Sequence, residues 1–157
     1  MYSNGIQTYR RTNVMTADPG KLVMLCYEGA IDNLKIGKQR IAEEDYEGRS
    51  KSLGKAQDII GELLCSVNLE RGGSIAKGLD SLYNYMLRRI IHADLKNDLS
   101  AIEEVIGMLT ELRAAWQEIF NQQGGEITPE KLGIDQEKGQ ASGFRSKENL
   151  SKLILRS

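Results

Sequence analysis

The side chains that could do covalent or metal chemistry are few in this sequence of 157 residues. There is one histidine, His92, and there are two cysteines, Cys26 and Cys65. A di-iron helical bundle needs a Glu-x-x-His motif on each of two helices, so a single histidine excludes that class. The cysteines form no CxxC pair or Cys/His cluster and fall within apolar helical patterns. We therefore expect two buried thiols that act as small hydrophobic side chains, and no metal site.

Carboxylates and arginines cluster at a few points of the chain. Acidic residues are adjacent at 43–45 and 103–104, but neighbouring residues on a helix do not converge on one point, so these groups are expected to be solvated. Arg88 and Arg89 are expected to pair with acids of the last helix, the alternative being a partner protein. No phosphate-binding loop, dinucleotide fingerprint or Ser/His/Asp set is present. The sequence therefore predicts a protein that is not an enzyme and needs no cofactor.

The composition is that of an ordinary globular domain, with 40% hydrophobic and 27% charged residues. The net charge of −1 gives no reason to expect nucleic acid or membrane lipid as a partner. The N-terminus lacks a basic region followed by an apolar core, and the apolar run at 22–27 is far too short to span a bilayer. A cytoplasmic protein without membrane insertion is expected.

Apolar residues recur in steps of three and four, which predicts helices. Asp18 and Pro19 are typical of a helix start, as cap and first helical residue. Gly72-Gly73 ends the second helix and Ser74 is expected to cap the third, whose wide apolar face predicts the central, buried helix. The expected helices cover residues 18–44, 46–71, 74–92 and 102–120. Four amphipathic helices joined by short turns predict an all-α fold, an antiparallel four-helix bundle.

The two ends of the chain differ from this pattern. Residues 1–16 show neither strand alternation nor a helical stripe and are expected to be mobile or to lie over the bundle, so the bundle domain is 1–120. Residues 121–157 are expected to be a flexible tail, because 121–145 is rich in Gln, Gly, Glu and Lys. The tail ends in a short amphipathic stretch in which Leu150, Leu153 and Ile154 share one face.

The first helix has more apolar surface than one neighbour can cover. Between 22 and 31 it is apolar almost all round, including Met24 and Tyr27. One side of it is therefore a candidate binding groove. The alternative is that all these residues are core or lie under the N-terminal segment, and periodicity does not decide between the two.

Several stretches match one protein family in order and spacing over about residues 6–120. They are DPGKLVMLCYEGAI (18–31), KAQDII (55–60), LERGGSIA (69–76), LYNYMLRR (82–89), EVI (104–106) and LRAAW (112–116). The chain resembles the flagellin-specific export chaperones, the FliS family. It departs in detail, with Glu28 where the family usually has aspartate, and the tail after Asn121 is longer than the family's usual end.

The resemblance implies a helical bundle without catalysis that acts in the cytoplasm. Its partner would be the C-terminal segment of flagellin, which it keeps from polymerising early and hands to the flagellar type III export apparatus. It also implies that the N-terminal segment, residues 1–16, is a lid over the groove that flagellin displaces. The candidate partner contacts are Ile6, Tyr9 and Val14 in the lid and Met24, Tyr27 and Ile31 in the groove.

Two further hypotheses remain open from the sequence. The end of the tail, NLSKLILR at 149–156, resembles the leucine-rich C-terminus of flagellins, so it is a candidate competitor for the chain's own groove or a neighbour's. The alternative is a chance leucine pattern in a disordered tail. In place of a chaperone, the spare apolar face would also suit a self-associating structural bundle without a flagellin partner.

Overall fold

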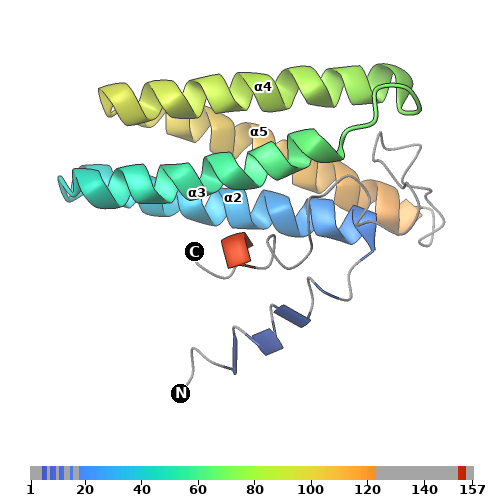
Figure 1. The fold of residues 1–157 in the computed structure, drawn as a ribbon, viewed down its shortest axis with the longest axis horizontal. Coiled ribbons are helices and arrows are strands. Elements are labelled where there is room, and N and C mark those ends of the chain that lie inside the picture. The colour runs from blue at the N-terminus through green and yellow to red at the C-terminus, as the bar shows by residue number, and fades with distance from the viewer. Residues whose placement is uncertain are drawn as a thin grey trace.

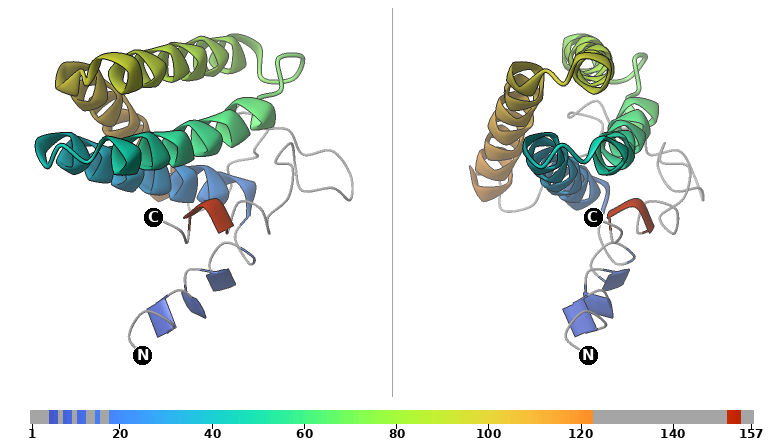
Figure 2. Two further views of the ribbon diagram at one scale, coloured as in Figure 1. Left: turned by 60° about the vertical axis from the view of Figure 1, so that its left-hand side comes forward. Right: turned by 90° about the vertical axis from the view of Figure 1, so that its left-hand side faces the viewer.

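The computed structural model describes residues 5–6, 8–9, 11–12, 15, 18–122 and 152–154. Its main elements are four helices, α2 (Pro19–Ala42), α3 (Tyr46–Ser66), α4 (Gly73–Lys96) and α5 (Leu99–Gln122). Consecutive helices run in opposite directions, and seen nearly end-on they form the four corners of a bundle (Figures 1 and 2). Helix α2 packs against α3 and α5, and α4 packs against the same two helices. The predicted all-α fold with four main helices is confirmed.

Short-range hydrogen bonds explain where two of these helices begin. The Asp18 carboxylate accepts a hydrogen bond of 2.8 Å from the Lys21 backbone N–H, and Pro19 occupies the first helical turn, as predicted. In the same way the Asp45 carboxylate accepts from the Gly48 N–H at 3.0 Å and caps α3. Each cap satisfies a backbone donor that the first helical turn leaves without a partner.

The bounds of α3 and α4 differ from the predicted ones. Helix α3 ends at Ser66, before the glycine pair, and α4 begins at Gly73 with Gly72 at the cap position and no side-chain cap. The prediction that Ser74 caps α4 is therefore wrong, because the Ala76 N–H already donates to the Gly72 carbonyl oxygen at 3.3 Å and Ser74 lies inside the first turn. Helix α4 then continues to Lys96, where Asn97 in the left-handed conformation ends it.

The most enclosed helix is α2. The wide apolar face of residues 74–92 had predicted that α4 would be the central, buried helix, and this prediction is wrong. Eleven residues of α2 are buried and only six of α4, which leaves Ile75, Leu82 and Ile91 exposed. A wide apolar face shows that a helix has apolar surface to cover, but not whether another element covers it. None of the helices in the described part of the chain is long and apolar enough to cross a lipid bilayer.

The two cysteines have different environments. Cys26 is fully buried in the core, as predicted, and burial raises its thiol pKa well above the ordinary value. Cys65 is exposed, so the prediction of a second buried thiol is wrong. Both positions fit an apolar helical pattern, but residue 65 falls on the outward side of α3, whereas its neighbour Leu63 points into the core.

Candidate functional site

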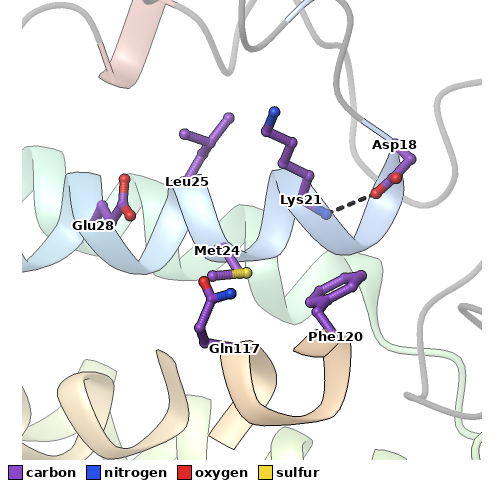
Figure 3. Close-up of a pocket in the computed structure, with 7 residues that line it drawn as sticks. All are labelled: Asp18, Lys21, Met24, Leu25, Glu28, Gln117 and Phe120. Carbon is purple, nitrogen blue, oxygen red and sulfur yellow. Dashed lines mark hydrogen bonds between the residues drawn. The ribbon is translucent and has the colours of Figure 1, made fainter. Parts of the chain in front are cut away.

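A hollow of about 350 Å³ lies between the first half of α2 and the last turns of α5. Both helices contribute side chains to it (Figure 3). We call its apolar residues, Met24, Leu25 and Phe120, the floor, and its charged residues, Asp18, Lys21 and Glu28, the rim. The lining residues are Asp18, Lys21, Met24, Leu25, Glu28, Gln117 and Phe120. An apolar floor within a polar rim is the usual arrangement of a site that accepts hydrophobic side chains.

The floor of the hollow is held in place by close packing of α2 on α5. A Cβ atom at Gly20 would overlap the Phe120 ring, so the glycine lets this ring lie directly against α2. Phe120 also packs beside Trp116, with ring centroids 6.5 Å apart. Met24 and Leu25 are partly buried next to the core and keep part of their apolar surface accessible. Thioether side chains such as Met24 adapt to apolar partners of different shape.

The rim is tied together by one charge-assisted contact between the two helices. The Arg113 guanidinium donates two hydrogen bonds to Glu28 Oε1, from Nε at 2.9 Å and from Nη2 at 2.7 Å. Both side chains are about half exposed, so the pair contributes little to stability. It does fix the position of the Glu28 carboxylate, which lines the hollow.

Two of the predicted groove contacts lie inside the bundle. Tyr27 is fully buried, and its hydroxyl lies 2.7 Å from that of Tyr83 on α4. Ile31 is 9% exposed and belongs to the core. In this conformation neither side chain reaches the surface, whereas Met24 does, so the structure places the three predicted groove residues in two different environments.

The described residues of the N-terminal segment do not cover the bundle. Ile6 and Tyr9 are 54% and 68% exposed, and the pieces of chain that carry them extend away from α2 (Figure 1). Val14, the third predicted lid contact, lies outside the described residues. The expectation that this segment lies over the groove is not met by Ile6 and Tyr9, and their role as partner contacts remains a prediction.

Of the seven residues that line the hollow, only Met24 was predicted as a partner contact. Phe120, near the end of the last helix, lines it together with Leu25 and Gln117. The signal was weak, because a residue near the end of a helix shows its apolar character but not what lies beside it. Gly20 was the better indication, since a glycine in the first turn of a helix often marks a close approach.

The polar residues considered for chemistry are engaged in surface contacts. Arg89 Nε lies 3.5 Å from a carboxylate oxygen of Glu104 on α5. The predicted pairing of an arginine with an acid of the last helix is therefore confirmed. His92 Nε2 lies 3.2 Å from an Asp98 carboxylate oxygen at the turn between α4 and α5. Among the described residues, no three His, Cys, Asp or Glu side chains are grouped so that they could hold a metal ion.

Comparison with known proteins identifies relatives over most of the chain. Residues 2–123 match the family described as Flagellar protein FliS. The flagellar secretion chaperone FliS of Salmonella typhimurium is 37% identical over 125 residues, which are 76% of this chain and 93% of that protein. The proteins of the same name from Bacillus subtilis and Escherichia coli are 35% and 33% identical, over 73% and 75% of this chain and 85% and 91% of their own.

The matched region and the bundle coincide. The family match ends at residue 123 and α5 ends at Gln122, so the part of the chain that resembles these proteins is the four-helix bundle with its N-terminal segment. The family consists of secretion chaperones and not of enzymes, in agreement with the prediction made from the reactive residues. This chain belongs to the FliS family of flagellar secretion chaperones.

Proposed function

We propose that this protein binds the C-terminal segment of flagellin in the cytoplasm, keeps it from polymerising early and supports its delivery to the flagellar export apparatus. The observation that carries the proposal is the family match over the whole bundle, together with relatives that are named flagellar secretion chaperones. The apolar hollow on α2 and α5 supports it, because a chaperone for an aggregation-prone segment needs apolar surface to cover that segment.

The recognition we propose is that of an amphipathic helix in a groove. Apolar residues of the bound segment would lie on the floor formed by Met24, Leu25 and Phe120, and polar groups would meet the rim at Lys21 and Glu28. Each large aliphatic side chain buried in this way contributes about 1.5–3 kcal/mol. Ordering a flexible segment offsets a substantial part of this gain, so several such contacts leave a complex that is tight but releasable.

The predicted contact residues take different parts in this proposal. Met24 is a direct contact, because it lines the hollow. Tyr27 and Ile31 hold α2 in place from inside the bundle, since both are buried. Ile6, Tyr9 and Val14 are proposed as contacts that meet the bound segment directly.

The proposal is tested with a fluorescently labelled peptide of the flagellin C-terminal segment, titrated with full-length protein and followed by anisotropy. Met24→Glu puts a charge on the apolar floor, and burying this charge under a bound segment is costly. Binding is therefore expected to weaken roughly tenfold or more, and tenfold corresponds to about 1.4 kcal/mol. Leu95→Glu is the matched control. Leu95 is 76% exposed in the last turn of α4, which adjoins the start of α5, whereas the hollow lies at the end of α5.

Circular dichroism shows whether both variants keep the helical fold. If the wild-type protein does not bind the peptide, the proposed function is wrong. If Met24→Glu and Leu95→Glu bind equally well, the hollow is not the contact surface. Light scattering of the same samples distinguishes a one-to-one complex from a self-associated bundle that ignores the peptide.

A further inference from the structure

The C-terminal end of the chain returns to the bundle and lies on α2. Residues 152–154 form a short helical turn beside α2, shown in red in Figures 1 and 2. Ile154 is only 6% exposed, and Leu153 is partly buried against the core. Lys152 points outward and is exposed. Two adjacent aliphatic side chains are thus covered at a position far from the bundle in sequence.

The surface that receives Ile154 has a shape that suits it. A Cβ atom at Gly29 of α2 would lie 3.3 Å from Ile154 Cγ1 and 3.4 Å from Ile59 Cδ1 of α3. The missing side chain at Gly29 therefore leaves a shallow space bordered by Ile59, and Ile154 fills it. We call this place, formed by Gly29 and Ile59, the Gly29 surface.

The Gly29 surface adjoins the hollow described above. Leu25 lines the hollow and Gly29 follows it by four residues, so both lie on the same side of α2, one turn apart. An amphipathic helix that enters the hollow and continues along α2 would reach the Gly29 surface within about 6 Å, the rise of four helical residues. The turn at 152–154 therefore lies on the path of such a helix.

The docked turn comes from a part of the chain that lies outside the family match. The family match ends at residue 123, and the Salmonella typhimurium relative aligns over 76% of this chain. The chemistry of the docked turn nevertheless resembles a cargo helix, since Leu153 and Ile154 present adjacent aliphatic side chains and Lys152 remains in solvent.

We propose that the Gly29 surface is a docking site for an aliphatic helical turn, and that Leu153 and Ile154 of this chain occupy it until the export cargo replaces them. This inference rests on the proposed function for the identity of the cargo. Because the turn is covalently attached, cargo competes with a local concentration on the order of millimolar. The apparent dissociation constant of the cargo equals its intrinsic value divided by the fraction of chaperone whose site is vacant.

The first experiment compares the affinity of full-length variants for the flagellin C-terminal peptide. Ile154→Ser removes the aliphatic anchor, and Lys152→Ser changes an exposed residue of the same turn as the matched control. With the site occupied roughly 70–90% of the time, Ile154→Ser is expected to bind the peptide about 3–10-fold tighter. Lys152→Ser should match the wild type. Equal affinity of wild type and Ile154→Ser, or weaker binding by Ile154→Ser, would overturn the proposal.

The second experiment does not depend on flagellin. A synthetic peptide of residues 146–157 is added to the full-length Ile154→Ser protein labelled with ¹⁵N, and amide shifts are followed. Changes centred on Gly29, Ala30 and Ile59 are expected, while the same peptide with Ile154→Ser should cause none. Absence of shifts at Gly29 would overturn the docking site. Binding of this peptide to a protein that ignores flagellin would uphold the docking site and contradict the proposed function.

Discussion

At the scale of single residues, the bundle is joined across its diagonal by two tyrosines. Tyr27 of α2 and Tyr83 of α4 are buried, and their hydroxyl oxygens lie 2.7 Å apart. The Trp116 ring meets Tyr27 edge-on, with centroids 6.2 Å apart. Because helices α2 and α4 do not adjoin along their length, this hydrogen bond specifies how the two opposite corners of the bundle face each other. A buried hydroxyl that loses its partner is costly, which makes the pair testable.

The tyrosine pair predicts non-additive stability changes. Tyr83→Phe leaves the Tyr27 hydroxyl without this buried partner and is expected to lower the free energy of unfolding by about 1–3 kcal/mol. The double variant Tyr27→Phe/Tyr83→Phe should lose clearly less than the sum of the two single changes, because it strands no hydroxyl. Urea unfolding followed by the fluorescence of Trp116, the only tryptophan, measures all three. Strict additivity would show that the hydroxyls act independently.

At the scale of helices, one close contact of α2 and α3 depends on a glycine. A Cβ atom at Gly37 would lie 2.7 Å from Leu53 Cδ2 and 3.1 Å from Leu53 Cγ, and Leu53 is fully buried. At Gly54 of α3, the next residue, an added Cβ would meet nothing within 4 Å. A glycine inside a helix weakens it unless a neighbour packs close, and no described atom packs close to Gly54.

These two glycines predict opposite effects of the same substitution. Gly37→Ala is expected to lower the free energy of unfolding by about 1–3 kcal/mol, because buried Leu53 has little room to move away. Gly54→Ala should raise it by about 0.5–1 kcal/mol, since alanine is the better helix former where no clash opposes it. Thermal or urea unfolding of the two variants provides the comparison. Stabilisation by both would mean that α3 shifts freely on α2.

At the scale of the whole molecule, three of the ionisable groups enclosed between the helices have raised pKa values. Burial raises the pKa of Cys26, Tyr27 and Tyr83 above their ordinary values of 9.0 for the thiol and 10.0 for the phenols. For Cys26 the nearby carboxylate of Glu62 adds to the effect. The folded protein therefore keeps these protons at a pH at which the unfolded chain releases them.

The bundle should consequently lose stability in alkaline solution. Below pH 9 all three groups are protonated in both states and the folded state keeps its full stability. As pH rises through 9 and 10, these three groups ionise in the unfolded chain but stay protonated in the folded protein. The free energy of unfolding therefore falls, by up to about 1.4 kcal/mol per pH unit for each group. Urea midpoints measured from pH 7 to 10.5 test this, and Cys26→Ala should flatten the first part of the decline. A midpoint independent of pH would contradict it.

Local patterns alone determined the helices, the helix start at Asp18-Pro19 and the family. These features depend on spacing along one element and on caps within four residues, so they are readable without the rest of the fold. Met24 was predicted as a groove contact together with Tyr27 and Ile31, and the pattern did not separate the accessible residue from the two buried ones. The family match lies within residues 2–123, where the motifs occur in order.

Only the tertiary structure decided which apolar faces are covered and by what. Cys26 and Cys65 fit similar patterns, yet one lies in the core and the other on the surface. Helix α4 carries the wide apolar face, but α2 is the more enclosed helix. Phe120 lines the hollow and Ile154 fills the space at Gly29, because segments far apart in the chain contact each other there. Periodicity identifies an apolar stripe, whereas burial depends on which other element packs against it.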